Sequence, residues 1–234
     1  LKKLKLVSKK NLITLNNKTR DRKIKVIKDS KSKIIFLEKY VTSNNYYSSL
    51  KYQDDIKKTL KRSKKNSNVK IMSGNIKTPI IEDDFRRVNQ FDKFLRKKDI
   101  LDFGCGWGGF LKNVRTYKSL NGVELRKECL SYIRHSLKKI NISNNINSFD
   151  KKFDIITMFH VLEHIPYQVE TLKSLKSKLK NKGKIIIEVP HAEDFLILQN
   201  ELKEFKNFTF WSEHLILHTY KSLKTILFKS GFRN

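Results

Sequence analysis

A turn that carries four glycines constrains the fold of this chain more than any other stretch. Residues 100–110 read Ile-Leu-Asp-Phe-Gly-Cys-Gly-Trp-Gly-Gly-Phe, so a short apolar strand leads into a glycine-rich turn and an apolar helix start follows at Phe110. Glycine is needed where a backbone turns sharply and where a ligand must approach without meeting a Cβ atom. This stretch therefore predicts a strand, a ligand-binding turn and a helix, in that order.

An acidic residue further along the chain indicates what the turn binds. Asn-Gly-Val-Glu-Leu at 121–125 predicts a second short strand, and Glu124 lies twenty-two residues after Asp102. An acid about 20 residues beyond a glycine turn suits the two hydroxyls of a ribose. A nucleoside-containing cofactor is the first inference. Because Gly104, Gly106 and Gly109 also satisfy G-x-G-x-x-G, a dinucleotide site and an ordinary strand-to-helix turn remain alternatives at this point.

The rest of the chain alternates predicted strands with predicted helices. Phe153–Phe159 and Lys184–Val189 are largely apolar strands, and a Gly-terminated helix stop is expected at Gly183. Strands that alternate with helices of about 10 to 15 residues predict βαβ units, and right-handed crossovers allow an open α/β sheet with helices on both faces. The apolar positions of the two intervening helices are Leu130, Ile133, Leu137 and Ile140, and Val169, Leu172, Leu175 and Leu179.

The motifs at 100–110, 122–125, 153–165 and 182–191 resemble those of the class I S-adenosylmethionine-dependent methyltransferases. The similarity is greatest to the branch of ubiquinone-type O-methyltransferases and type 11, 12 and 23 bacterial enzymes, and it covers residues 86–232. The resemblance implies a Rossmann-like, doubly wound, mostly parallel sheet. It also implies S-adenosyl-L-methionine as the cofactor and disfavours a nicotinamide nucleotide.

The resemblance implies a set of cofactor-binding residues. Asp102 would bond the amino group of the cofactor, and Glu124 would accept hydrogen bonds from its ribose hydroxyls. Arg87, or the arginine before it, would meet the cofactor carboxylate. Asp150 is the candidate for reading the adenine, and Phe159 would cover the cofactor from the end of its strand. The full set is Asp102, Gly104, Cys105, Gly106, Glu124, Leu125, Asp150, Phe159 and Arg87.

Histidines are the candidates for acid–base chemistry. A sulfonium methyl group is already activated, so its transfer rewards alignment and the exclusion of water. A hydroxyl or amine acceptor must still lose a proton, and histidine is matched to that task near neutral pH. Our first candidate for the general base is His214, followed by His191 and His164. His191 and His164 follow the carboxyl ends of predicted strands, where ligands bind in open α/β sheets.

The run His-Val-Leu-Glu-His at 160–164 raises the possibility of a metal. It matches H-x-x-E-H, a zinc-peptidase pattern that needs a helix, but here it follows a buried strand. In the ubiquinone-type enzymes Glu-x-x-Glu-His at this place is associated with a divalent metal. This chain has His160 for the first Glu, and His160, Glu163 and His164 would suit zinc better than magnesium. We nevertheless expect no metal, with Glu163 and His164 bonding backbone and shaping the loop.

The segment 212–218 corresponds to a loop that the family places over the acceptor pocket. Trp211, Phe208 and Phe210 are candidates for the wall of that pocket, and the alternative is that these aromatic rings only pack. Thr19–Asp21 is a further candidate for contact with the active-site side.

Composition bears on partners and location. The net charge of +28 would normally point to nucleic acid. The excess is mostly lysine spread along the chain, without an aromatic–basic RNA motif, so nucleic acid is not the expected partner. Cys105 and Cys129 form no disulfide framework, which is typical of a reduced cytoplasmic protein. No apolar run approaches the roughly 18 residues of a membrane span. Oligomeric state cannot be read.

Two regions are expected. Residues 1–85 would form an N-terminal appendage with a β-hairpin (23–27 and 33–37) and a lysine-rich, partly helical connector reaching residue 70. Residues 86–234 would form the methyltransferase domain. The chain begins at Leu1 and ends three residues beyond Gly231, where a helix cap is expected. Because the last two strands of the family would follow, we expect a fragment truncated before them.

The functional hypothesis is methyl transfer to an oxygen or nitrogen atom of a small-molecule or glycan-type metabolite. The alternatives are an RNA or protein methyltransferase and a non-catalytic module that only binds the cofactor.

Overall fold

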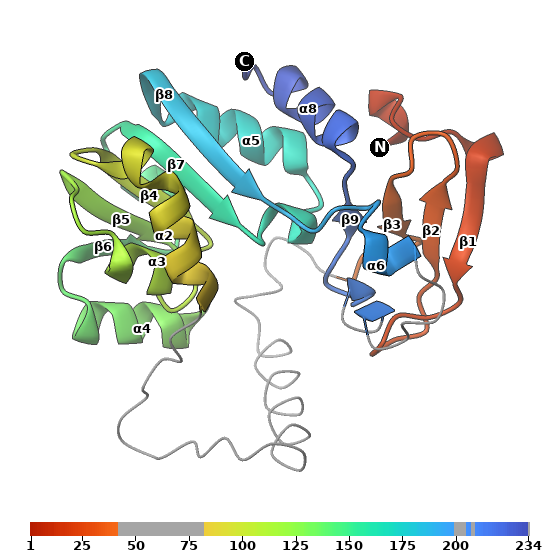
Figure 1. Ribbon diagram of the computed structural model, residues 1–234, viewed down its shortest axis with the longest axis horizontal. Coiled ribbons are helices and arrows are strands. Elements are labelled where there is room, and N and C mark those ends of the chain that lie inside the picture. Colours follow the sequence, from red (N-terminus) through yellow and green to blue (C-terminus); the bar gives the residue numbers. More distant parts are fainter. Residues whose placement is uncertain (42–81, 199–204, 207–208, 234) are drawn as a thin grey trace, which may run out of the picture. The chain divides into compact units, whose positions relative to one another are not determined.

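A computed structural model describes residues 1–41, 82–198, 205–206 and 209–233 of the protein (Figure 1). Contacts divide the chain into two compact units. Unit 1 comprises residues 1–43, 158–178 and 186–234, and unit 2 comprises residues 44–157 and 179–185. The predicted connector and the aromatic candidate Phe208 lie outside the described residues. The expected division of the chain at residue 85 remains a prediction.

The five-stranded sheet has the order β6-β5-β4-β7-β8. Its strands are β4 (Asp99–Phe103), β5 (Ser119–Val123), β6 (Ile140–Ser143), β7 (Phe153–Phe159) and β8 (Leu179–Glu188). The β4–β5, β5–β6 and β4–β7 pairs are parallel. Strand order therefore reverses direction beside β4, and the predicted Rossmann-like, doubly wound, mostly parallel α/β sheet is confirmed.

Three helices of unit 2 accompany this sheet: α2 (Glu82–Leu95), α3 (Gly109–Asn113) and α4 (Lys127–Ser136). The first turn of α2 holds three acidic residues, a placement that the positive end of a helix dipole favours. The predicted extension of the α4 face to Ile140 is wrong. The helix ends at Ser136, and Ile140 opens β6 in register with Leu120 of β5, because β-branched residues suit a paired strand.

The predicted helix stop at Gly183 is also wrong, because this glycine lies inside β8. The preceding helix α5 (Gln168–Ser177) ends earlier, and its C-cap is Lys178. A Cβ atom on Gly183 would lie 3.0 Å from the carbonyl oxygen of Phe153, which begins β7. The glycine therefore permits two backbones to approach each other and does not cap a helix.

Asp99, at the start of β4, forms hydrogen bonds and ion pairs with residues of other strands and of the loop before β7. Its buried carboxylate accepts hydrogen bonds from Lys180 Nζ (2.6 Å), Ser119 Oγ (2.7 Å) and Lys151 Nζ (3.3 Å). Asp154 accepts from the same Lys180 at 2.8 Å. Burial alone would raise the pKa of Asp99, but these hydrogen bonds hold that pKa well below its usual range.

Unit 1 contains a four-stranded antiparallel sheet in the order β1-β2-β3-β9. Its strands are β1 (Leu12–Asn16), β2 (Val26–Asp29), β3 (Ile35–Leu37) and β9 (Ile216–Leu217). The predicted hairpin is confirmed as β2 and β3, with slightly shifted ends. Strand β9 comes from the other end of the chain and pairs with β3, so that Ile35 faces Leu217. The sequence did not predict this pairing.

Helix α8 (Tyr220–Lys229) follows β9 with well-defined ends. Thr219 and Ser222 form a capping box at its start, and Gly231 has a φ of 88° just past its end, as the sequence predicts. The hydroxyl of Ser230 bonds the carbonyl of Val169, so α8 packs on α5 within unit 1. Among the helices described, none is long and apolar enough to cross a membrane.

The Asp99 network generates a stability prediction. Asp99→Asn should lower the free energy of unfolding at pH 7 by about 1–2 kcal/mol, since charge-assisted hydrogen bonds are lost. Because the pKa of Asp99 is lower in the folded protein, its charge stabilises the fold fully above the ordinary pKa near 4, and this stabilisation is lost as the pH falls below that value toward the folded pKa. Asp99→Asn should therefore lose less stability in acid than the unmodified protein. Urea unfolding between pH 3 and pH 7 measures both. Asp92→Asn, which removes a half-exposed pair with Arg96, is the control and should cost under about 0.5 kcal/mol.

Candidate functional site

The glycine turn directly follows β4 in unit 2. Gly104 and Gly106 have φ values of 79° and 55°, a left-handed backbone that other residues adopt only with strain. The amides of Gly104 and Cys105 donate to the carbonyl of Val123 at 2.8 and 3.1 Å. The turn thus folds over the end of β5, and this places it beside Glu124.

Glu124 contacts the turn directly. Its Oε2 accepts the amide hydrogen of Gly106 at 2.8 Å, and its Oε1 accepts from the amides of Leu125 (2.8 Å) and Arg126 (3.0 Å). Burial would raise the pKa of Glu124, but hydrogen bonds and the charge of Arg126 lower it below its usual value. An anionic carboxylate therefore lies against the glycine-rich turn, where it can accept hydrogen bonds. Its role as a cofactor ligand remains a prediction.

Arg126 was missed by the sequence analysis. Its Nη2 lies 3.0 Å from Oε2 of Glu124, and its Nε lies 3.2 Å from Oε1. A Cβ atom on Gly106 would lie 3.2 Å from the same Nη2, so the guanidinium lies beside the turn as well as the acid. It takes up hydrogen-bonding positions on both oxygens of Glu124. A cationic residue two positions after the acid was the only available signal.

Asp102 is buried near the end of β4 and accepts a hydrogen bond from Thr157 Oγ1 at 2.7 Å. Burial raises its pKa to about 7, and the hydrogen bond from Thr157 only partly offsets this. The negative charges of Asp84 and Glu124 raise it further. Thr157 was also missed, although a single hydroxyl inside the apolar strand 153–159 was a usable signal.

Arg87 lies on α2 and is buried beside two acids. Its Nη1 is 3.7 Å from Oδ1 of Asp84, and its Nη2 is 3.9 Å from Oδ2 of Asp83. The Asp84 carboxylate approaches Gly109 so closely that a Cβ there would collide with it. Arg87 lowers the pKa of Asp102, so it acts on the predicted amino-group ligand electrostatically. Contact with a cofactor carboxylate remains a prediction.

The remaining cofactor candidates differ in accessibility. Cys105 is buried, and burial raises the pKa of its thiol well above the usual value, so it is no nucleophile. Its Sγ lies where a Cβ on Gly122 would come within 2.7 Å, which explains the glycine in β5. Leu125 is partly exposed and contributes its amide to Glu124. Asp150 is exposed after the short 3-10 helix η3 (Ile146–Ser148). The other predicted candidate, Phe159, ends β7.

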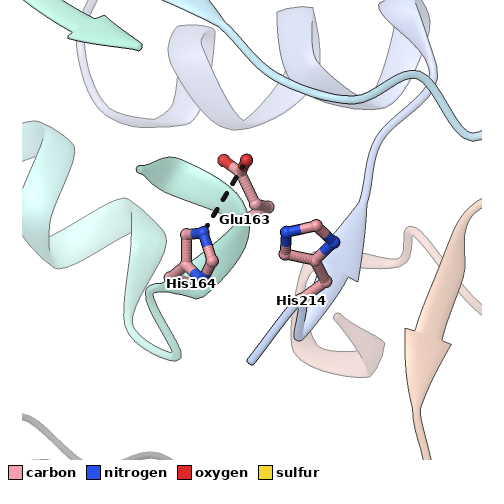
Figure 2. Close-up of side chains that lie close together, drawn as sticks. All are labelled: Glu163, His164 and His214. Carbon is pink, nitrogen blue, oxygen red and sulfur yellow. Dashed lines mark ion pairs between the residues drawn. The ribbon is translucent and has the colours of Figure 1, made fainter. Parts of the chain in front are cut away.

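In unit 1 three side chains converge, as Figure 2 shows: Glu163, His164 and His214. Glu163 and His164 lie on the 3-10 helix η4 (Leu162–His164), and His214 precedes β9. The two imidazole rings have centroids 4.9 Å apart. The amide of Leu215 donates to the carbonyl of Glu163 at 2.8 Å, which fixes the two segments together. The sequence analysis named His164 and His214 as separate candidates for the general base. The structure brings their rings together.

Both rings are oriented by backbone carbonyls. Nδ1 of His164 lies 2.9 Å from the carbonyl oxygen of Glu213, and Nδ1 of His214 lies 2.8 Å from that of Thr209. A carbonyl can only accept, so Nδ1 carries the hydrogen and Nε2 keeps its lone pair in both residues. Burial lowers the pKa of His164 to about 4 and also lowers that of His214. Both imidazoles are therefore neutral at pH 7.

Trp211 packs on the same cluster. Its ring centroid lies 6.0 Å from that of His164 and 5.6 Å from that of His214. The guanidinium of Arg20 lies 4.5 Å from the Trp211 centroid, and Asp21 Oδ2 accepts the hydroxyl hydrogen of Ser212 at 2.5 Å. The segment that includes Thr19–Asp21 thus contacts Trp211 and the first residue of 212–218, and its contact with an active site remains a prediction. Whether these rings wall an acceptor pocket remains a prediction.

His160 and His191 are more exposed than His164 and His214. His160 is half-exposed, with Nδ1 3.3 Å from Glu163 Oε1 and Nε2 3.3 Å from Glu188 Oε1. His191 is exposed, and its two ring nitrogens lie near the amides of Glu193 and Tyr220, of which a neutral ring can accept only one. The run 160–164 forms a 3-10 turn after β7, so it lacks the helix that a zinc peptidase requires.

Comparison with known proteins identifies a family. A family model described as "Methyltransferase domain" matches residues 78–234. The ubiquinone biosynthesis O-methyltransferase of Nitrosococcus oceani is 33% identical over 122 residues, covering 46% of this chain and 51% of the relative. The tRNA U34 carboxymethyltransferase of Nautilia profundicola is 28% identical over 153 residues, covering 60% of this chain and 49% of the relative. The chain spans about half the length of these relatives.

Solved structures show the same fold. The plantazolicin methyltransferase BpumL, in complex with a pentazolic desmethylPZN analog and SAH, has a TM-score of 0.50 at 18% identity, covering 75% of this chain and 70% of the other. The YcgJ protein from Bacillus subtilis has a TM-score of 0.51 at 16% identity, covering 64% and 68%. At these identities the likeness concerns the fold alone.

The raised pKa of Asp102 predicts an unusual dependence of stability on pH. A buried acid whose folded pKa is about 7 makes the folded state bind a proton more tightly than the unfolded state, so stability falls as pH rises from about 4 to about 7. Asp102→Asn should remove a loss on the order of 2–4 kcal/mol across that range. Unfolding in urea at pH 5, 6 and 7 gives the difference between the two proteins. A constant difference at all three values would contradict the assignment.

Proposed function

The chain belongs to the class I S-adenosylmethionine-dependent methyltransferases, and from this premise we propose that it methylates an oxygen or nitrogen atom of a small-molecule or glycan-type metabolite. The observation that carries the cofactor site is the bond between Glu124 and the amide of Gly106. This bond joins an anionic acceptor to a turn whose glycines have left-handed φ values, and both features support a nucleoside site at this turn. Asp102, Gly104, Cys105, Gly106, Glu124 and Leu125 are the proposed cofactor residues nearest this bond.

In the proposed reaction the acceptor oxygen or nitrogen attacks the sulfonium methyl carbon, and the carbon–sulfur bond breaks to release the demethylated thioether. The acceptor proton passes to a base. Histidines of unit 1 are the candidates, in the order His214, His191 and His164. The Nε2 atoms of His214 and His164 carry lone pairs, because Nδ1 faces a carbonyl in each ring. Glu124 and Asp102 bind and orient the donor and take no part in the proton transfer.

The Nitrosococcus oceani relative, named for ubiquinone biosynthesis, supports a small acceptor. An RNA acceptor is the second candidate. The tRNA-directed relative and the charge of +28 favour it, whereas a cationic hollow in unit 2 does not. That hollow is lined by Lys112, Arg115, His135, Lys138 and Lys139, among others. Leu120 and Ile140, which also line it, lie at the starts of β5 and β6. The glycine turn follows the opposite ends of the strands, so an RNA held in the hollow would not lie against the methyl donor.

The cofactor assignment predicts different effects on cofactor affinity for substitutions of Glu124 and Arg126. Glu124→Gln should weaken binding of S-adenosylmethionine about 10- to 100-fold, since charge-assisted bonds to the ribose are lost. Arg126→Ala should leave the affinity unchanged or raise it a few-fold, because the guanidinium competes with the ribose for Glu124. Isothermal titration calorimetry measures both, with exposed Glu128→Gln as the matched control. Equal losses in the Glu124 and Arg126 variants would mean that Arg126 itself binds the cofactor.

A turnover assay separates the functional alternatives. Methyl-labelled cofactor is incubated with the protein and either a metabolite extract or total RNA, and transferred label is counted. We expect label in small molecules and its loss in Asp102→Ala and Glu124→Ala. Label in RNA, together with RNA binding that weakens steeply with salt, would favour the second candidate. Binding of cofactor without transfer to either pool would indicate the non-catalytic module.

A further inference from the structure

We infer that Glu163, His164 and His214 form a binding site for a divalent transition metal of the zinc class within unit 1. One ligand atom from each residue lies within 4.8 Å of the other two. Nε2 of His164 is 3.9 Å from Oε1 of Glu163. Ligands around a tetrahedral zinc lie roughly 3.4 Å apart at bond lengths of about 2.0–2.1 Å. Small side-chain rotations would therefore close this cluster on an ion (Figure 2).

The two imidazoles already have the form that a metal requires. The Nδ1 atoms face the carbonyls of Glu213 and Thr209 at 2.9 and 2.8 Å, and the Nε2 atoms keep their lone pairs. Metal-bound histidines almost always donate their second ring nitrogen to a carbonyl or carboxylate, which fixes the tautomer and the ring plane. These two histidines have that outer support in place, although they come from segments fifty residues apart.

The carboxylate of Glu163 supplies an independent argument. Glu163 is fully buried, and its Oε2 has no hydrogen-bond partner among the described residues. A buried carboxylate oxygen without a partner is costly, so native proteins rarely leave one. The contacts described for this carboxylate, to His160 Nδ1 at 3.3 Å and to His164 Nε2 at 3.9 Å, are both to Oε1. A cation held between Glu163 and the two imidazoles would satisfy the open oxygen.

This ligand set differs from the one that the sequence suggested. The run His160, Glu163 and His164 would have used consecutive residues of one turn. The structure instead has His160 half-exposed between two carboxylates and brings in His214 from the segment before β9. Our expectation of no metal rested on Glu163 and His164 both bonding backbone. His164 does bond the carbonyl of Glu213, but Oε2 of Glu163 has no partner among the described residues.

The donor set indicates the metal. Two imidazoles and one carboxylate match three-ligand zinc sites, in which a fourth position is left for water or substrate. Nitrogen ligands favour zinc, cobalt or nickel over magnesium and calcium. The ion would join η4 to the segment before β9. It would also occupy the Nε2 atoms of His164 and His214, which leaves exposed His191 as the candidate base in the proposed reaction.

The metal content of the chain tests the inference without any turnover. The protein is stripped with a chelator, dialysed against Zn²⁺ and then against metal-free buffer, and its zinc is measured by mass spectrometry. We expect one zinc per chain and a rise in Tm when Zn²⁺ is added. Both should be lost in His214→Gln and Glu163→Gln. The matched controls His160→Gln and His191→Gln should keep the bound zinc.

Each outcome has a definite meaning. If His214→Gln retains as much zinc as the unmodified protein, the proposed site is overturned. The same holds if neither protein retains zinc. Loss in His160→Gln with retention in His214→Gln would assign the ion to the consecutive run instead. Circular dichroism of every variant reports that the protein is folded, and cofactor titration separately tests the proposed cofactor residues around Glu124 in unit 2. A failed zinc result therefore leaves the proposed function untouched, and absent methyl transfer leaves the metal result interpretable.

Discussion

The hydrogen bond from the Gly106 amide to Glu124 is the interaction on which the candidate cofactor site depends. It links the turn after β4 to the residue that follows β5, the neighbouring parallel strand. The bond requires two glycines in left-handed conformations and a small residue between them, and Cys105 meets that need. Glycine 122 in turn makes room for the cysteine thiol. Residue sizes in the turn and in β5 are thus matched to each other.

The same carboxylate is already saturated. Five donor atoms, from Gly106, Leu125 and Arg126, lie within hydrogen-bond distance of Glu124. A ribose could bond it only after the Arg126 guanidinium moves aside. Binding of a nucleoside would therefore exchange an internal ion pair for two hydroxyl contacts. The affinity of the site therefore depends on how strongly the partly exposed Arg126 is held by the buried Glu124.

Sequence reasoning found the central sheet because each of its signals is local. The apolar strands, the glycine turn and the acid after β5 can all be read within a few residues. The wrong predictions concern residues whose structure is determined by contacts with residues far away in the sequence. Gly183 is explained by its approach to Phe153, and β8 begins early because Lys180 bonds Asp99 and Asp154. A helix-stop pattern contains no information about those partners.

The candidate sites follow the same rule. Glu124 and Asp102 were predictable from spacing, whereas Thr157 gains its importance only when β7 pairs beside β4. His164 and His214 were each identifiable as histidines of interest. Their convergence depends on a bond between Leu215 and Glu163 that joins remote segments. The open oxygen of Glu163 is a property of three-dimensional packing, and no sequence pattern carries it.

The pairing of β3 with β9 has a consequence for how this protein can be divided. The family match begins at residue 78, which suggests that the first forty residues could be removed without harm. They supply three of the four strands in the sheet that Ile216 and Leu217 complete, along with much of the apolar core around them. Removing them would expose the apolar residues of β9 and of the preceding segment, which carries His214. The two ends of the polypeptide are thus mutually dependent, and neither is an accessory to the other.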